Sequence, residues 1–247
     1  MALQEEFEKQ GNWLFKRRSF LPLLIVIIGG GWYVFLLNHN IALIHHWWVD
    51  FLFLCVGFLG LGIRIFTVGF TPKGTSGRNT GTGQIAEQLN TAGIYSMVRH
   101  PLYLGNFFMW LAPVLLLTDV WFTLFFCAFY WIYYERIIFA EEQFLRKKFG
   151  EGYVDWASKT PAFFPKFSLF KKADLQFSLK NVLQREYNGF FGLVFTMTLF
   201  RMVGFVVSTK QLYLDKPWII IFSIALGIFL LLKTLKKFTK TLTVEGR

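Results

Sequence analysis

The chain has 247 residues, of which 54% are hydrophobic, 20% are aromatic and only 17% are charged. Soluble domains average about 25% charged residues, so the composition argues against a water-soluble domain. The formal net charge is +11, but the basic residues lie between apolar runs, where they can face anionic lipid head groups. We attribute the basicity to membrane topology and expect no nucleic-acid partner.

The first apolar run follows an N-terminal segment, residues 1–18, that is too long and too acidic for the basic start of a signal peptide. This run is therefore expected to stay attached as the first membrane span. The two cysteines, Cys55 and Cys127, both fall inside apolar runs, where a thiol behaves as a small hydrophobe. They indicate neither a disulfide framework nor a metal site.

Six apolar runs approach the length needed to cross a hydrocarbon layer of about 30 Å. In the bilayer core the backbone polar groups must be satisfied within each segment, which favours helices. The sequence therefore predicts an all-α integral membrane protein with about six transmembrane helices. The expected spans cover residues 20–37, 49–70, 101–117, 120–139, 189–207 and 212–232.

The distribution of Lys and Arg predicts the orientation of these spans. Basic residues gather before the first span, between the second and third, between the fourth and fifth, and after the sixth, whereas the opposite loops hold only Lys210 and Lys216. Short cytoplasmic loops carry the Lys and Arg excess, so both termini are expected in the cytoplasm. We expect a bacterial inner membrane rather than the endoplasmic reticulum.

The third and fourth spans are separated by little more than Thr118 and Asp119, so they are expected to form a tight antiparallel helical hairpin. The cytoplasmic ends of a hairpin lie side by side. Polar residues that are distant in sequence are thereby brought together at one membrane face. They are Arg99, His100, Glu135, Arg136, Glu141 and Glu142.

The connecting segments carry weaker signals. Residues 74–83, GTSGRNTGTG, are rich in Gly, Ser and Thr and predict a flexible connector. Gly81, Gly83 and Ala86 match the spacing of a dinucleotide fingerprint, but no strand precedes them and the match is interpreted as coincidence. Residues 167–186 are basic and partly amphipathic, which predicts a surface helix leading into the fifth span.

Two charged residues fall within the spans, Arg64 and Arg201. Charged groups at membrane depth are costly and often functional, so each is a candidate contact for a lipid head group or a substrate. Arg64 lies near the cytoplasmic end of its span, where its side chain could instead reach the interface.

Residues 93–105 read GIYSMVRHPLYLG. Proline is favoured at the first position of a helix, so Pro101 marks the start of the third span and places Arg99 and His100 at the positive end of the helix dipole. That end can bind an anion. A second stretch contains Glu141-Glu142, Leu145, Phe149-Gly150 and Tyr153. By itself it is explained by a surface pair between Glu142 and Arg146.

Together these stretches resemble the isoprenylcysteine carboxyl methyltransferase family and its wider superfamily of membrane methyltransferases, which includes phospholipid methyltransferases. The family pattern, approximately G-x-Y-x-x-x-R-H-P-x-Y-x-G followed by a hairpin, an E-E pair, F-G-x-x-Y and a proline-bearing segment, is present over residues 93–165. The resemblance implies three regions: residues 1–92 with two spans and a cytoplasmic loop, a methyltransferase core at 93–165, and a basic linker with a two-span extension at 166–247.

The resemblance also implies a cytoplasmic segment that binds S-adenosylmethionine and an acceptor that enters from the bilayer as a lipid or a lipidated molecule. Arg136 and Arg99 are the candidate catalytic residues, since a guanidinium can pair with an anionic acceptor. No metal is expected. The candidate cofactor-binding residues are Gln88, Leu89, Tyr95, His100, Pro101, Tyr103, Glu141 and Glu142.

Several functions remain open at this level. O-methylation of a carboxylate is preferred, and methylation of a phospholipid amine or a lipid phosphate is the alternative. An NADPH-dependent reductase resembling the sterol reductases shares the R-H-P-x-Y-x-G motif, but there the acid pair is typically replaced and a cysteine lies nearby, whereas here Glu141-Glu142 is intact and no cysteine follows Cys127. A transporter or scaffold would explain the spans but not the converging charges, and the oligomeric state is left open.

Overall fold

The computed structural model describes residues 2–18, 21–41, 46–72, 74–75, 84 and 86–246, with the backbone alone at residues 21 and 22. Within these ranges all regular elements are helical, and the one β-type contact is an isolated bridge between Gly93 and Lys171. Most of the predicted connector at 74–83, including Gly81 and Gly83, lies outside the described residues.

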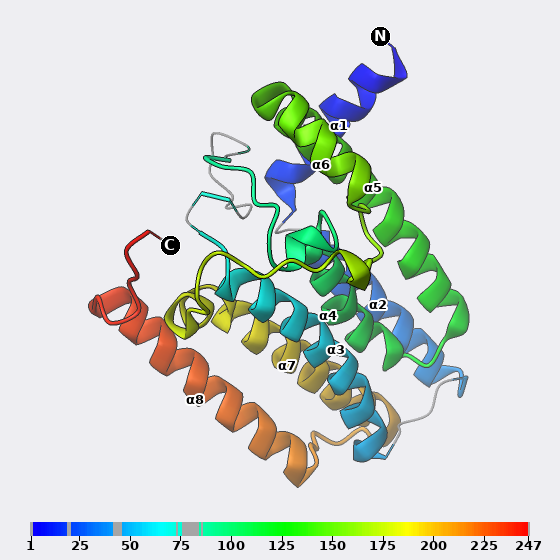
Figure 1. Cartoon of the computed structure of the whole chain (residues 1–247). Helices are drawn as coiled ribbons and strands as arrows, with labels where there is room; N and C mark the ends of the chain where they lie inside the picture. The colour runs from blue at the N-terminus through cyan, green and yellow to red at the C-terminus, as the bar shows by residue number, and fades with distance from the viewer. Residues whose placement is uncertain are drawn as a thin grey trace.

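An apolar helix is found at each of the six predicted positions (Figure 1). Four helices, α3, α5, α7 and α8, are long and apolar enough to cross a membrane, and two apolar helices are shorter, α4 and the Leu23–Asn38 part of α2. The prediction of an all-α membrane protein is confirmed. The bounds are α2 Leu21–Asn38, α3 Trp47–Gly69, α4 Pro101–Leu115, α5 Val120–Phe149, α7 Leu179–Thr209 and α8 Lys216–Phe238.

The structure differs from the prediction in the helices near the predicted cytoplasmic face. Helix α5 continues past residue 139 to Phe149 and ends at Gly150, which has a φ of 56°. The helix predicted over 167–186 is present only from Leu179 onward, as the first turns of α7, and not as a separate surface helix. That segment holds only the short 3₁₀ helix η2 (Phe167–Leu169) before Ser178, whose hydroxyl accepts a hydrogen bond from the Asn181 N–H and caps the start of α7.

The N-terminal segment forms a helix that the sequence analysis did not anticipate, α1 (Leu3–Arg17). It packs along the last turns of α5 (Figure 1). A Cβ atom added at Gly11 would lie 2.0 Å from the Arg136 carbonyl oxygen, so only glycine permits this approach. Phe7 and Phe15, one turn to either side of Gly11, lie on the same face of the helix.

Helices α3 and α4 cross at close range. A Cβ atom added at Gly60 would lie 2.4 Å from the Gly105 carbonyl oxygen, and one added at Gly105 would lie 2.6 Å from Cγ of Arg64. The two glycines therefore let the backbones approach, as small residues do between membrane helices. This crossing holds the Arg64 side chain against the first turns of α4.

A layer of short elements covers one end of the bundle, opposite the α7–α8 connection (Figure 1). It contains the 3₁₀ helix η1 (Ile94–Ser96), α6 (Glu151–Lys159) and η2. The Arg99 N–H donates to the Pro161 carbonyl at 2.9 Å, and the His100 N–H donates to the Ala162 carbonyl at 3.2 Å. These bonds join the segment before α4 to the segment after α6.

The opposite end holds a buried charge cluster built around Arg201. Its Nη1 lies 2.8 Å from Asp50 Oδ2 and its Nη2 lies 2.7 Å from Asp215 Oδ2. Arg201 and Asp50 are 5% and 1% exposed. The arginine therefore ties α3 and α7 to the connection before α8.

Candidate active site

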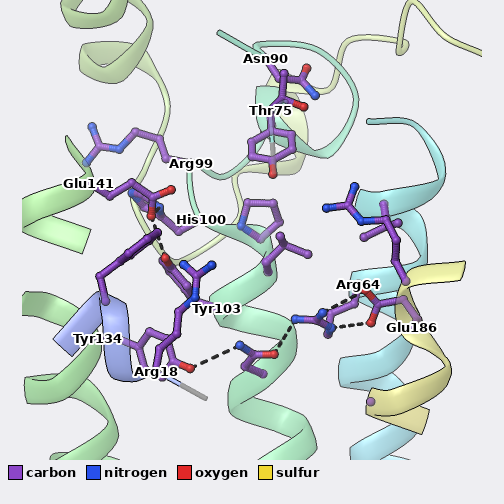
Figure 2. Close-up of a pocket in the computed structure, with 18 of the residues that line it drawn as sticks. Arg18, Arg64, Thr75, Asn90, Arg99, His100, Tyr103, Tyr134, Glu141 and Glu186 are labelled. Carbon is purple, nitrogen blue, oxygen red and sulfur yellow. Dashed lines mark hydrogen bonds and ion pairs between the residues drawn. The ribbon is translucent and has the colours of Figure 1, made fainter. Parts of the chain in front are cut away.

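A cavity of about 470 Å³ lies beneath the covering layer, within the size range of roughly 300–1,000 Å³ typical of small-molecule sites. Its wall combines α1, α3, α4, α5 and α7 with the segment that precedes η1. Figure 2 shows part of this wall, with His100 and Tyr103 from α4 and its cap, Glu141 from α5, and Arg64 and Glu186 on the opposite side.

Most of the residues singled out from the sequence line this one cavity, although they come from separate segments. The hairpin and the bonds between residues 99–100 and 161–162 account for this convergence. Glu142 and Arg136 are not part of the lining. The predicted residues that line it are Gln88, Leu89, Tyr95, Arg99, His100, Pro101, Tyr103 and Glu141.

The two consecutive glutamates face different surroundings. The Tyr103 hydroxyl donates to Glu141 Oε2 at 2.8 Å, so Glu141 is held at the cavity wall. Glu142 Oε1 lies 2.9 Å from His100 Nε2 and 3.1 Å from Arg99 Nε. Neighbouring residues of a helix point about 100° apart. Glu142 therefore lies behind His100 and Arg99, beside a second cavity of about 310 Å³, and the proposed surface pair with Arg146 is replaced by these contacts.

Arg136 is not brought to the site. Its guanidinium lies 3.5 Å from the centre of the Phe7 ring, and its Nη1 lies 3.0 Å from Glu135 Oε2. Helical geometry explains this placement, because Arg136 is turned by roughly 200° from Tyr134, which lines the cavity. The hairpin topology predicts the end of α5 that carries Arg136 but not the face of the helix on which its side chain lies.

A partly buried polar network that sequence reasoning did not assemble runs from Arg64 and Glu186, on the side of the cavity opposite Glu141, across to Tyr134 of α5 (Figure 2). Arg64 donates from Nε and Nη2 to the two carboxylate oxygens of Glu186, at 2.7 and 2.9 Å, and from Nη1 to Asn106 Oδ1 at 2.6 Å. Asn106 in turn donates to the Tyr134 hydroxyl at 3.3 Å. The bidentate pair neutralises Arg64, which was a candidate substrate contact.

Helix α1 also contributes to the wall, through Phe15 and Arg18. The Arg18 guanidinium lies 3.9 Å from the centre of the Phe15 ring. Phe7, Gly11 and Phe15 are spaced four residues apart, and this spacing could have predicted from the sequence a helix with one packed face.

Two tyrosines of the covering layer remain uncharged. Burial, and then the nearby Glu141 carboxylate, raise the pKa of Tyr95 well above its ordinary value. Burial and Glu142 raise the pKa of Tyr153 in the same way. Tyr95 therefore offers a neutral phenol ring to the cavity. No group of three or more metal-ligating side chains occurs among the described residues.

Part of the chain is similar to known proteins. Residues 51–152 match the sequence model of the phospholipid methyltransferase family. A nickel-cobalt-cadmium resistance protein from Alcaligenes xylosoxydans xylosoxydans is 33% identical over 126 residues, which are 50% of this chain and 55% of that protein. A protein-S-isoprenylcysteine O-methyltransferase from Schizosaccharomyces pombe is 40% identical over 78 residues, 31% of this chain and 33% of the yeast protein.

A second protein-S-isoprenylcysteine O-methyltransferase, from Arabidopsis thaliana, is 30% identical over 126 residues, which are 49% of this chain and 61% of the plant protein. The matched part spans about half the length of the first curated relatives, 55% and 54%. No solved structure matches the chain. Residues 51–152 of this chain are thus similar to the phospholipid methyltransferase family, and parts of the chain are similar to the isoprenylcysteine O-methyltransferases, as the motifs indicated.

Proposed function

We propose that the chain transfers a methyl group from S-adenosylmethionine to a lipid or lipidated acceptor in the membrane, with O-methylation of a carboxylate as the preferred reaction. The observation that carries the proposal is the convergence of Tyr95, His100, Tyr103 and Glu141 on one cavity, at the end of a bundle of apolar helices. A cavity at the end of the helix bundle can receive both a cofactor from the aqueous phase and an acceptor from the bilayer.

The chemistry of the wall fits this cofactor. S-adenosylmethionine carries an amino-acid head joined to an adenosine, so it requires donors for a carboxylate, an acceptor for an ammonium or ribose hydroxyls, and an apolar or aromatic face for adenine. His100 would supply a donor, Glu141 the acceptor, and Tyr95 with Leu89 the faces. The bound cofactor would supply an electrophilic methyl group.

The role left to the protein is to position the acceptor and exclude water. A carboxylate acceptor is ionised at neutral pH and attacks without a general base. The apolar helices around the cavity would exclude water from the reacting atoms, which strengthens the electrostatic interactions within the site. Arg99, which lines the cavity, is the candidate for pairing with the anionic head.

A phospholipid amine is the second candidate acceptor, and the family match at residues 51–152 favours considering it. An amine must lose a proton, and the Glu141 carboxylate on the cavity wall is the candidate to accept it. For the topology we propose that both termini and the covering layer face the cytoplasm.

The proposal is tested by calorimetry of the purified chain with S-adenosylmethionine, S-adenosylhomocysteine and NADPH. Binding of the first two and not of NADPH is expected, and binding of NADPH alone would refute the methyltransferase assignment. Transfer of a radiolabelled methyl group to a prenylcysteine analogue, to phosphatidylethanolamine or to a native lipid extract then identifies the acceptor. Label found only in water-soluble products would exclude a lipid acceptor.

A further inference from the structure

The cavity continues below the polar residues into the apolar part of the bundle. From Pro101 to Pro113, both of which line it, α4 rises by about 18 Å at 1.5 Å per residue. The lining changes along this path, from His100 and Tyr103 near the covering layer to Met109 and Trp110 further down. We call the lower part, lined by Met109, Trp110 and Pro113 and by the facing residues of α7, the deep limb.

The α7 side of the deep limb leaves space unfilled. Gly189, Gly192, Leu193 and Thr196 line it, and they fall on one face of the helix because they are three and four residues apart. A Cβ atom added at Gly192 would meet no atom within 4 Å, and one added at Gly189 would meet the terminal methyl of Met109 at 3.2 Å. Gly192 is exposed although it lines the cavity, so no side chain of the protein covers α7 at this position.

The Thr196 hydroxyl and the charged pair above the deep limb are already satisfied by the protein. The Thr196 hydroxyl donates to the Gly192 carbonyl at 2.8 Å. Above the deep limb, Arg64 and Glu186 bind each other through two hydrogen bonds. An occupant of the deep limb would therefore meet methyl, methylene and aromatic surfaces, which favour an apolar chain.

We propose that the deep limb binds a single alkyl or prenyl chain of the acceptor and that Gly192 determines whether the chain can enter. The inference rests on the proposed function, because the chain is that of the methyl acceptor. The whole cavity measures about 470 Å³ and must also hold the cofactor and the reacting head, so we infer one chain rather than two. Helix α7 lies outside the family match at residues 51–152, so this selectivity is a property of the extension.

Photolabelling of the full chain in lipid nanodiscs tests the inference. Two single-chain probes with a diazirine at the chain end are used, an S-farnesylcysteine analogue and palmitic acid, so that prenyl and acyl chains are distinguished. Labelled peptides are located by mass spectrometry. Labelling by either probe at Met109, Trp110 or Leu193 is expected, and labelling by neither probe at these residues would overturn the inference.

Substitution of Gly192 provides the specific control. Gly192→Phe should abolish the labelling, because the ring would occupy the deep limb, whereas Gly192→Ala should retain it. Gly62→Phe is the matched control, since Gly62 is also a helical glycine with no atom within 4 Å of an added Cβ but does not line the cavity. Undiminished labelling of Gly192→Phe would refute the inference.

Calorimetry on the same variants separates the inference from the proposed function. Gly192→Phe should bind S-adenosylhomocysteine as the unmodified chain does, because Gly192 lies on α7, away from Tyr95 and Glu141. If S-adenosylhomocysteine binds and Gly192→Phe labels normally, the deep limb fails as a chain site while the proposed function stands. If the unmodified chain binds no S-adenosylhomocysteine and yet Gly192→Phe alone loses labelling, the proposed function fails and the chain site stands.

Discussion

Glu141 offers the sharpest test of the proposed cofactor site, because its neighbours in sequence provide matched controls. Glu141→Gln removes the negative charge but keeps an oxygen that can accept the Tyr103 hydrogen bond, which is 2.8 Å long. Loss of a charge-assisted hydrogen bond costs about 1.5–3 kcal/mol, and each 1.4 kcal/mol is about a factor of ten in affinity. S-adenosylhomocysteine should therefore bind about 10- to 150-fold more weakly, as measured by calorimetry.

Two further variants separate this effect from a general change in charge. Glu142→Gln should have a smaller effect, since Glu142 does not line the cavity and acts through His100 and Arg99. Glu135→Gln should have none, because the Glu135 side chain is 52% exposed and pairs with Arg136. If all three variants fold with unchanged thermal midpoints and Glu141→Gln binds the ligand normally, the assignment of Glu141 to the cofactor is wrong.

The remaining predictions concern stability and topology. Arg201→Met should destabilise the protein by about 3–5 kcal/mol, because it leaves the buried carboxylate of Asp50 without its partner. Glu8→Ala, at the exposed pair with Lys147, should cost at most about 1 kcal/mol. Thermal unfolding in detergent compares the two variants, and equal losses of stability would contradict the reasoning. Cysteines introduced in α6 and at Gln211 should be labelled from opposite sides of sealed vesicles, and labelling of both from one side would refute the proposed topology.

The sequence was sufficient to predict the six apolar helices and much of the cavity wall. Long apolar runs admit only helices in a bilayer, and the short link at Thr118 and Asp119 forces the hairpin. Once the hairpin forms, His100 and Glu141 must meet, since they lie at its two adjacent ends. Local composition and connection length were enough for these features.

Rotational position and long-range pairing could not be predicted in the same way. The face on which Arg136 lies depends on α5 continuing as one helix to Phe149 and on α1 packing against it. The partner of Arg64 is Glu186, which lies 122 residues further along the chain, and no local pattern specifies such a pair. Buried charges in apolar helices indicate that a partner exists, but the tertiary fold determines which residue it is.

The pairing of Arg64 with Glu186 has a consequence for the biosynthesis of the protein. Arg64 enters the membrane with α3, whereas Glu186 belongs to α7 and emerges from the ribosome only after the hairpin has been made. An arginine at the centre of a membrane helix costs about 2.5–3.5 kcal/mol on insertion scales, and Arg64, which lies nearer the end of α3, costs less. Until α7 is inserted, the charge of Arg64 on α3 lacks its Glu186 partner. The insertion of α7 supplies this partner, which stabilises α3 in the membrane, and it completes the wall of the cavity in the same step.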